Sequence, residues 1–408
     1  MIKEFNFNGV IPASKSCMNR ALICASFKDE VILQGSSSCD DVVKMQEALS
    51  QLKLNMGIYD CGSAGTVLRF LALRVSRKPG VHILKGTPRL LARPQNDLAK
   101  ILNQLGVQID FQTDRLIISS PNGWRLANKT LKVNRQSSSQ FASAILLNAW
   151  DLDFPLHIEW ESETQVSEGY FQMTKQMVKD FGMDLIESPS GLQIPKNSKV
   201  KAQSYRIESD LSSAFAIAAY AALNGDATFK DFPFQSLQPD HVFVDILKAM
   251  GAGVEKTDSS VRVFKKYKDK QFLRGVTWNI NDCPDLFPVL ATLCAFAAGP
   301  SKLYGAPHLV HKESNRIQKT AEILKMIHVP HKILPDGIEI LPNENISLIT
   351  QAQFKFNTDH DHRLAFAAAL IASQNFPIVI EHPEVVNKSF PEFWDIINKE
   401  NDPTTKVG

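Results

Sequence analysis

Basic and hydroxyl side chains gather in a few short stretches of this chain, and their spacing suggests the binding of an anion. In the first stretch Lys15 precedes Ser16 and Arg20, which are four residues apart and so share one face of a helix. Lysine supplies a point charge and arginine a planar fork, which together suit a phosphate or a carboxylate. An apolar run follows, so a charged Arg20 inside it needs a partner.

Later stretches add small, hydroxyl and basic residues. Gly65 lies among small residues that would let a ligand approach the backbone closely. The run Ser137-Ser138-Ser139-Gln140 offers hydroxyls that can either bind phosphate or cap a helix. The remaining cations of these stretches are Arg69, Arg93, Lys312, Arg316, Arg363 and Lys388.

Two carboxylates, Asp285 and Glu313, fall in the same stretches. Asp285 stands at an expected helix start, where an acid commonly caps the helix, and a catalytic base needs more evidence than this position. Glu313 lies among cations, so it can be an ion-pair partner or an acid/base catalyst, and the residue pattern leaves both open. The string Asp359-His360-Asp361-His362 suggests a metal site. However, neighbours along a backbone rarely converge on one point, and Arg363 beside them would repel a cation. We therefore predict no metal.

Composition narrows the class of protein. The 408 residues carry a formal net charge of +2 and 44% hydrophobic residues, so the chain lacks the basic excess of a nucleic-acid binder. Six cysteines form no CxxC pair. The beginning of the chain has no signal-peptide pattern, and apolar stretches such as Ala214–Leu223 are too short to cross a bilayer. We expect a cytoplasmic globular protein with reduced cysteines, bound to neither membrane nor nucleic acid.

The stretches belong to an internal repeat. Six Ala-rich apolar runs each follow a small or acidic polar start, at Ser14, Ser63, Ser137, Ser209, Pro284 and Thr358. Four of the five spacings are 72–75 residues, and only the first is shorter, by about 25 residues. Helices that are apolar all round are buried. The short first repeat indicates that one copy has lost a hairpin or loop.

A second element recurs in the same phase. It is an amphipathic helix, as in residues 96–109 and 317–333, and it leads into short strands such as residues 107–112 and 115–120. Each repeat of about 73 residues is therefore a buried helix, strand, amphipathic helix and strand. Six repeats predict an α/β protein of two domains with three repeats each, 14–208 and 1–13 plus 209–408. Six helix N-termini converging from both domains would bind a polyanionic ligand in the cleft between them.

These motifs, in this order, resemble those of the EPSP synthase (3-phosphoshikimate 1-carboxyvinyltransferase) family over essentially the whole chain. PASKSCMNRAL is similar to the family's PGSKSxxNRAL, SAGTVLR to NAGTxxR and ARPQNDL to ERPxxxL. SSQF, SDLSSA, HKESNRI, DHRLA and KSFPEF are similar to SSQF, GDxSSA, VKETDR, DHRMA and KTFPDYF.

The resemblance implies a fold and a reaction. The fold is a two-domain inside-out α/β barrel, with each domain built of three βαβαββ-type units around buried parallel helices. The reaction transfers the enolpyruvyl group of phosphoenolpyruvate to the 5-hydroxyl of shikimate 3-phosphate and releases phosphate, on the route to chorismate and the aromatic amino acids. The family implies no cofactor, and we expect a monomer.

The resemblance also implies residue roles. Asp285 would accept the proton of the attacking hydroxyl, Glu313 would protonate the methylene of phosphoenolpyruvate, and Lys15 would assist phosphate departure. Shikimate 3-phosphate would be held by Lys15, Ser16, Arg20, Ser138, Ser139, Gln140, Ser167, Asp285, His308 and Lys312. Phosphoenolpyruvate would be held by Lys15, Gly65, Arg93, Gln140, Arg316, Arg363 and Lys388.

Some positions depart from the family pattern. Ser63 stands where Asn is common, Phe70 where Pro is often found, and His308 where Asn or Glu usually contacts the sugar. The related UDP-N-acetylglucosamine 1-carboxyvinyltransferase usually has Lys-Asn in place of Lys15-Ser16 and a Cys in the loop corresponding to residues 86–96, where this chain has none. A non-catalytic anion-binding protein of the same fold is the other alternative.

Two further expectations concern ligands. The cations Lys15, Arg20, Arg69, Arg93, Lys312, Arg316, Arg363 and Lys388 should repel one another without an anion and hold the domains apart. Because Gly65 is retained, glyphosate should compete with phosphoenolpyruvate, as in the family.

Overall fold

The computed structural model describes residues 4–128, 130–266, 273–342 and 353–398. The chain divides into two compact units. Unit 1 combines Met1–Pro12 with Ser209–Gly408, and unit 2 is Ala13–Glu208. The predicted boundary between residues 13 and 14 lies one residue from this division. Among the described residues no helix is long and apolar enough to span a membrane.

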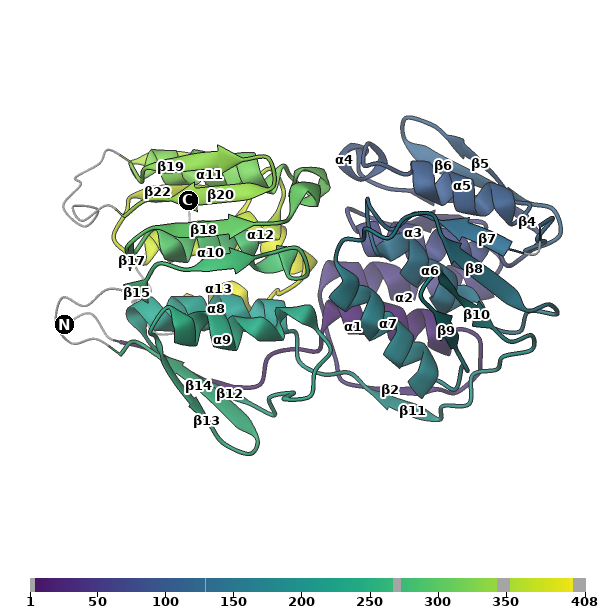
Figure 1. Cartoon of the computed structure of the whole chain (residues 1–408), viewed down its shortest axis with the longest axis horizontal. Helices are drawn as coiled ribbons and strands as arrows, with labels where there is room; N and C mark the ends of the chain where they lie inside the picture. Colours follow the sequence, from purple (N-terminus) through teal and green to yellow (C-terminus); the bar gives the residue numbers. More distant parts are fainter. Residues whose placement is uncertain (1–3, 129, 267–272, 343–352, 399–408) are drawn as a thin grey trace. The chain divides into compact units, whose positions relative to one another are not determined.

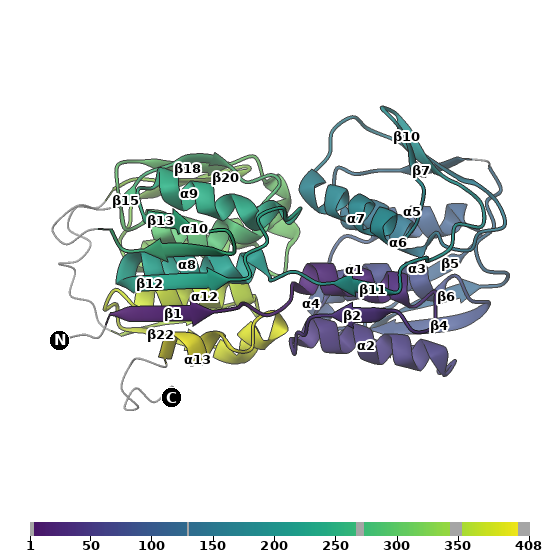
Figure 2. The same ribbon diagram turned by 90° about the horizontal axis from the view of Figure 1, so that it is seen from below.

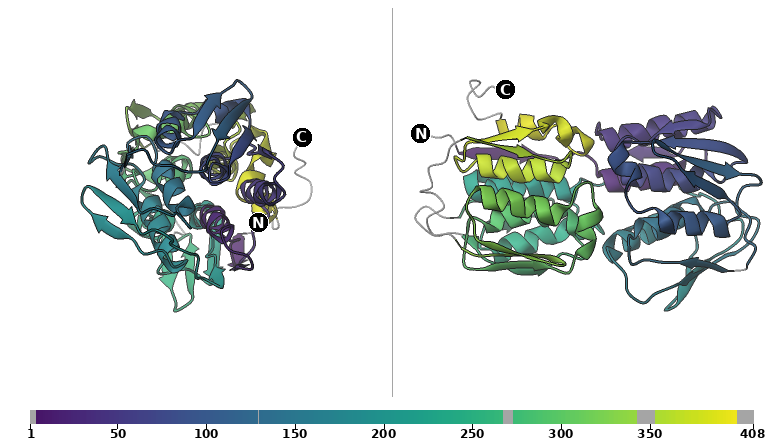
Figure 3. Two further views of the ribbon diagram at one scale, coloured as in Figure 1. Left: turned by 90° about the vertical axis from the view of Figure 1, so that its right-hand side faces the viewer. Right: turned by 90° about the horizontal axis from the view of Figure 1, so that it is seen from above.

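Unit 2 is built around three buried helices that pack against one another: α1 (Lys15–Ala25), α3 (Gly65–Val75) and α6 (Gln140–Asn148). Figure 3 (left) shows helices of this unit end-on. Their apolar side chains form one core, with Leu68, Phe70 and Ile145 fully buried. The amphipathic helices are α2 (Asp40–Lys53), α5 (Asn96–Gln104) and α7 (Glu168–Asp180), with the short α4 (Pro88–Leu91) before α5.

Three sheets complete unit 2. The sheet order β3-β4-β6-β5 uses β3 (Ile58–Asp60), β4 (Gly80–Lys85), β5 (Gln108–Phe111) and β6 (Arg115–Ser120). The order β7-β8-β10-β9 uses β7 (Thr130–Val133), β8 (Leu156–Trp160), β9 (Ile186–Ser188) and β10 (Gly191–Ile194). The third sheet pairs only β2 (Ile32–Gln34) with β11 (Ser204–Arg206), in parallel.

Unit 1 repeats this plan. Its buried helices are α8 (Leu211–Asn224), α10 (Phe287–Cys294) and α12 (His362–Ala372), and its other helices are α9 (Phe243–Ala249), α11 (Arg316–Met326) and α13 (Phe393–Asn398). All of these helices are labelled in Figure 1. The three buried helices pack on one another, and the residues they bury belong to one core cluster.

The first strand of unit 1 comes from the beginning of the chain. β1 (Phe5–Gly9) pairs in parallel with β12 (Gly225–Lys230), in a sheet of order β1-β12-β14-β13 completed by β13 (Gly253–Lys256) and β14 (Ser260–Phe264). Figure 2 shows the purple β1 among the later strands of this unit. The order β16-β18-β20-β19 uses β16 (Thr277–Asn279), β18 (Ser301–Tyr304), β19 (His331–Leu334) and β20 (Gly337–Ile340). The two-stranded sheets pair β15 (Leu273–Arg274) with β17 (Ala297–Ala298), and β21 (Phe354–Asn357) with β22 (Ile378–Glu381).

The loss of a hairpin from the first repeat is confirmed. After α5 and α7 the chain forms an antiparallel hairpin, β5–β6 and β9–β10, that completes a four-stranded sheet. After α2 the chain instead runs directly into β3, and the β11–β2 sheet keeps two strands. The predicted repeat also lacked one strand, because each full repeat begins with a strand that pairs in parallel, as β3 does with β4.

The helix starts were only partly predicted. Ser14, Asp210 and Asp361 accept hydrogen bonds from backbone N–H groups of α1, α8 and α12, which is ordinary capping. The caps of α3 and α10 are Ala64 and Leu286. Neither residue has a side chain that can accept such a hydrogen bond, so α3 and α10 lack the N-cap side-chain bond that α1, α8 and α12 have.

Two of the second hairpin strands, β10 and β20, begin with a glycine that is required sterically. A Cβ on Gly191 would lie 1.9 Å from the carbonyl oxygen of Ile158, and one on Gly337 would lie 1.9 Å from that of Leu303. Backbone cannot move aside cheaply, so Gly191→Ala should lower the free energy of unfolding by roughly 3 kcal/mol. Urea denaturation checks this, with the exposed Lys196→Ala in the same unit as the control. A loss below about 0.5 kcal/mol would contradict the steric argument.

Candidate active site

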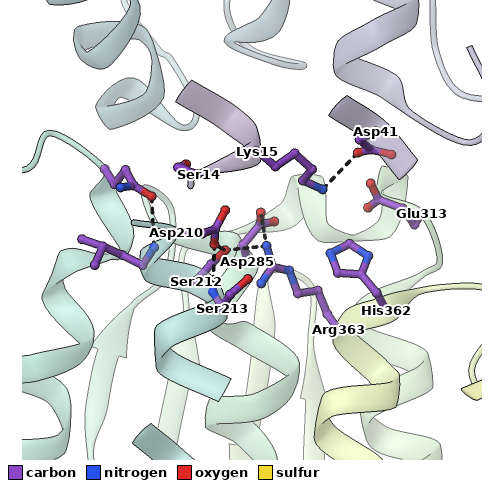
Figure 4. Close-up of polar contacts among 12 residues, drawn as sticks. Ser14, Lys15, Asp41, Asp210, Ser212, Ser213, Asp285, Glu313, His362 and Arg363 are labelled. Atoms are coloured by element: carbon purple, nitrogen blue, oxygen red, sulfur yellow. Dashed lines mark hydrogen bonds and ion pairs between the residues drawn. The ribbon is translucent and has the colours of Figure 1, made fainter. Parts of the chain in front are cut away.

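In unit 1, Asp285 lies between two arginines. It sits in the 3-10 turn η2 (Pro284–Leu286) that leads into α10. Its Oδ1 accepts a hydrogen bond from Arg316 Nη1 at 2.7 Å, and its Oδ2 accepts one from Arg363 Nη2 at 3.1 Å. Figure 4 shows Asp285 and Arg363 joined in this way. The carboxylate is therefore fixed by side chains from the two helices α11 and α12, and it does not cap α10.

Arg316 binds three carboxylates at once. Its side chain is 1% exposed, and besides Asp285 it donates to Glu313 Oε2 at 3.0 Å and to Asp361 Oδ2 at 2.8 Å. Ser314 Oγ also donates to Asp361, at 3.0 Å. A buried guanidinium with its fork fully used is rigid. Arg316 thus sets the positions of Asp285 and Glu313 relative to each other.

Arg363 is also held by a short polar chain, which meets the same Nη2 that donates to Asp285. Its Nη2 donates to Ser212 Oγ at 2.6 Å, and Ser212 Oγ donates to Asp210 Oδ1 at 2.8 Å. The same Asp210 oxygen caps α8 through the N–H of Ser213, at 2.8 Å. Arg363 Nε is buried without a hydrogen bond among the described residues. The N-terminal ends of α8 and α12 are joined by this chain.

The electrostatics of Asp285 favour its ionised form. Burial opposes ionisation, but the positive charges of Arg363, Arg316 and Lys312 outweigh it and hold the pKa of Asp285 well below its usual range. While both arginines are bound to it, Asp285 is a weak base. An anionic ligand that took over part of their hydrogen bonds would raise its basicity.

His308 lies beside this cluster and is neutral at physiological pH. It is buried in the turn η3 (Pro307–His311), and burial, together with the charge of Lys312, lowers its pKa to about 3. In the unfolded state His308 is protonated as the pH falls through about 6.5, whereas in the folded state it stays neutral until about pH 3. Burial of the neutral His308 therefore stabilises the folded state fully above pH 6.5, and this stabilisation is lost as the pH falls below that value.

We expect His308→Asn to reduce the acid sensitivity of unfolding. Because asparagine does not titrate, the free energy of unfolding should fall less between pH 6.5 and 4 in the variant than in the unchanged protein. Urea denaturation across this range provides the measurement. Gln235→Asn, at an exposed position of the same unit, is the control, and because it changes no titratable group it should keep the original slope. Equal slopes in all three proteins would contradict a depressed pKa for His308.

Two further predicted cations lie in unit 1. Lys312 directly follows η3, and its charge acts on both Asp285 and His308. Lys388 is 3% exposed at the end of η5 (Pro383–Lys388), a turn that packs on α12.

In unit 2, Lys15 is the first residue of α1 and is almost buried. Its Nζ lies 3.0 Å from Asp41 Oδ2, in the first turn of α2, and both side chains are at most 10% exposed. Figure 4 shows this pair. Sequence analysis missed Asp41, because an acid in the first turn of a helix is common and carries no distinctive signal.

Arg20 is a buried cation on the same helix. Its Nε donates to Thr174 Oγ1 at 2.7 Å and its Nη1 to the carbonyl of Ser16 at 2.8 Å, so Ser16 and Arg20 do share a face as predicted. Among the described residues no carboxylate pairs with it, and burial lowers its pKa to about 10. A charge held in this way is stabilised by an incoming anion.

Arg69 joins the starts of α3 and α6. Its Nη1 donates to Gln140 Oε1 at 2.9 Å and to Ser138 Oγ at 3.3 Å, and its Nε donates to Gln95 Oε1 at 3.2 Å. Its guanidinium also lies 4.6 Å from the Phe141 ring centroid. Ser138 and Gln140 therefore belong to one polar cluster around a buried arginine.

Gly65 begins α3 directly beside Arg93. A Cβ on Gly65 would lie 2.7 Å from Arg93 Nη1. Ser139 and Ser167 precede α6 and α7, and both are buried. Ser167 has the left-handed backbone angle φ 53°, which is uncommon outside glycine.

The expected repulsion among eight cations is wrong for at least three of them. Lys15, Arg316 and Arg363 are each paired with a carboxylate. The physical reason is that a buried charge is costly unless an opposite charge accompanies it. Net repulsion between the units therefore has no support from these three residues.

The Asp-His-Asp-His string is dispersed by the fold. Asp361 turns to Arg316, whereas His362 packs edge-on against Phe366 at 5.9 Å between ring centroids. The ring of His360 lies against that of His382, tilted by 34°, with 4.5 Å between the ring centroids. Among the described residues no three His, Cys, Asp or Glu side chains gather as metal ligands. Sequence analysis missed the structural role of Asp361, because its partner Arg316 lies 45 residues away.

Comparison with known proteins first defines the class. The fold matches that of an EPSP synthase from Acinetobacter baumannii with a TM-score of 0.74 at 22% identity, covering 98% of this chain and 96% of that one. The enolpyruvyl transferase NikO from Streptomyces tendae matches with a TM-score of 0.70 at 12% identity, covering 97% and 94%. The two units thus have the inside-out α/β fold of enolpyruvyl transferases, as predicted.

Sequence comparison then gives the family. Residues 55–397 match the family described as EPSP synthase (3-phosphoshikimate 1-carboxyvinyltransferase). A 3-phosphoshikimate 1-carboxyvinyltransferase from Syntrophobacter fumaroxidans is 31% identical, over 95% of this chain and 96% of the relative. The chain belongs to the EPSP synthase family.

Proposed function

We propose that this chain transfers the enolpyruvyl group of phosphoenolpyruvate to the 5-hydroxyl of shikimate 3-phosphate and releases phosphate. The proposal depends on one observation: Asp285 is bound between Arg316 and Arg363, and Arg316 also binds Glu313. Simple anion binding needs the arginines but not two carboxylates that compete with the anion. Acid/base chemistry on an anionic substrate needs both kinds of group.

The two acids act at different atoms. The 5-hydroxyl oxygen attacks C2 of phosphoenolpyruvate and its proton passes to Asp285, while Glu313 protonates the methylene carbon C3, giving a tetrahedral intermediate. In the second step C3 returns a proton to Glu313, and the proton held by Asp285 passes to the departing phosphate as the C2–O bond breaks, so that the enol ether forms and both acids return to their starting states. Lys15 balances charge on the departing phosphate. Fixed cations stabilise this charge without reorganising during the reaction.

The low basicity of Asp285 fits a substrate-activated base. The carboxylate and phosphate of phosphoenolpyruvate would engage Arg316 and Arg363, together with Arg93, Gln140, Lys388 and the space at Gly65. Each hydrogen bond that an arginine transfers from Asp285 to the substrate raises the pKa of Asp285 toward its usual range. The base would then be strongest when its substrate is bound.

Unit 2 supplies groups suited to shikimate 3-phosphate. Arg20, buried without a carboxylate partner among the described residues, and the hydroxyls of Ser16 and Ser138 suit a dianionic phosphate. The other proposed contacts are Lys15, Ser139, Gln140, Ser167, Asp285, His308 and Lys312. We further propose that the two units together form one active site, in the cleft between them. The enzyme works as a cytoplasmic monomer without a cofactor.

Phosphate release tests the proposal. The full chain is mixed with phosphoenolpyruvate and either shikimate 3-phosphate or UDP-N-acetylglucosamine, and inorganic phosphate is measured with time. Release with shikimate 3-phosphate alone is expected. Release with the nucleotide sugar would assign the other transferase activity, whereas binding without release would indicate an anion-binding protein. Light scattering during gel filtration tests the monomer.

A further inference from the structure

A pocket lies in unit 2 at the opposite ends of the helices that carry Lys15 and Gly65. It encloses about 710 Å³ and is lined by the last turns of α1 and α2, the segment 28–31, Arg74 at the end of α3, and Lys78. Because α1 rises about 1.5 Å per residue, its end is roughly 15 Å from Lys15. The pocket is therefore distinct from the candidate active site.

The missing hairpin accounts for this opening. In the sheets β3-β4-β6-β5 and β7-β8-β10-β9 the hairpin pairs with the strand that follows the buried helix. In the first repeat that strand is β2, which ends its two-stranded sheet. Val31 immediately before β2, and Leu49 and Leu52 on α2, line the pocket. Side chains that a hairpin would cover in a full repeat are thus left beside an open space.

Arg74 gives the pocket its charge. The residue is 8% exposed, and its Nε and Nη2 donate to the hydroxyl and carbonyl of Ser26 at 2.7 and 2.9 Å. Its guanidinium lies 4.0 Å from the Phe27 ring centroid. Among the described residues no carboxylate pairs with Arg74, and no residue accepts a hydrogen bond from its Nη1. Burial and the nearby Arg77 lower its pKa to about 10, which leaves it positively charged.

Lys78 adds a second positive charge. Its Nζ donates to the carbonyl of Leu52 at 3.0 Å and to Asn55 Oδ1 at 3.2 Å, so its neighbours there are uncharged. The other charges of the lining cancel, because Lys28 and Lys53 are matched by Asp29 and Glu30. The Lys53–Asp29 pair is 81% and 90% exposed and contributes little. The net charge of the lining thus comes from Arg74 and Lys78.

We propose that this pocket binds a small organic anion with one carboxylate or phosphate group and an apolar body. The acidic group would accept hydrogen bonds from Arg74 Nη1 and Lys78 Nζ, and the body would lie against Leu22, Leu49 and Val31. The volume is in the range of known ligand pockets, about 300–1,000 Å³. Arg74 and Lys78 also cap helix C-termini, which explains their positions but leaves Nη1 of Arg74 available.

Calorimetric titration of the full chain with phenyl phosphate and with benzoate tests the proposal. Saturating shikimate 3-phosphate is present to fill the candidate active site. We expect one of the two probes to bind at one site, and Lys78→Gln to weaken it about tenfold. Leu49→Asp should also weaken it, while the exposed Lys132→Gln serves as the control and should have no effect. If Arg74→Gln fails to fold because of its role at Ser26, the Lys78 and Leu49 variants still decide.

Several outcomes would overturn the proposal. These are no saturable binding of either probe, equal affinity for inorganic phosphate, or unchanged affinity in Lys78→Gln and Leu49→Asp. Weakening in Arg20→Gln instead of Lys78→Gln would place the probe in the candidate active site. Because phosphate release is measured separately, failure here leaves the proposed transferase activity untouched.

Discussion

Replacing Asp285 by asparagine should lower kcat about 10³-fold without weakening phosphoenolpyruvate binding. Asparagine removes the proton acceptor but keeps the size of the side chain. It also removes the negative charge that now competes for Arg316 and Arg363, through bonds of 2.7 and 3.1 Å. The two arginines should therefore bind the substrate anions as tightly as before, or more tightly.

Steady-state phosphate release gives kcat, and calorimetry with shikimate 3-phosphate present gives the dissociation constant of phosphoenolpyruvate. Asp258→Asn, in an exposed turn of the same unit, is the matched control and should change neither quantity. A merely structural Asp285 would give a different result, with weaker binding and a proportionate loss of stability. An unchanged kcat in Asp285→Asn would show that Asp285 is not the base.

The repeat and the fold were predictable because they follow local patterns, whereas the roles of the site residues were implied by the family resemblance and stay predictions. Apolar runs at spacings of 72–75 residues predicted the buried helices. One shorter spacing indicated that the first repeat had lost a hairpin or loop, and the structure shows that a hairpin is missing. Lys15, Ser16 and Arg20 stand close together in sequence, so their shared helix face could be derived.

The acidic partners could not be predicted in this way. Asp41 reaches Lys15 from the next helix, and Asp361 reaches Arg316 across 45 residues. In sequence both acids look like ordinary residues at the start of a helix, where a carboxylate is favoured anyway. The pairing depends on how repeats pack within a unit, which no local pattern records. For the same reason the pocket at Arg74 had no sequence signal.

Gly65→Ala should weaken both phosphoenolpyruvate and glyphosate by up to about a hundredfold, while the KM for shikimate 3-phosphate stays unchanged. The added methyl would lie 2.7 Å from Nη1 and 3.2 Å from Cζ of Arg93, so the guanidinium must move. Backbone strain has no part in this, because Gly65 is not among the residues with positive φ. The three atoms nearest to the added methyl all belong to Arg93, and none to Ser16 or Arg20, which are proposed contacts of shikimate 3-phosphate.

A double-mutant cycle isolates the cause. Arg93→Lys removes the atoms that the new methyl would meet, so Gly65→Ala should cost much less in that background than in the unchanged protein. The phosphoenolpyruvate KM and the glyphosate inhibition constant are measured in all four proteins. Strictly additive losses would show that the methyl acts through something other than Arg93. An unchanged glyphosate inhibition constant in Gly65→Ala would show that glyphosate does not bind where phosphoenolpyruvate is proposed to bind.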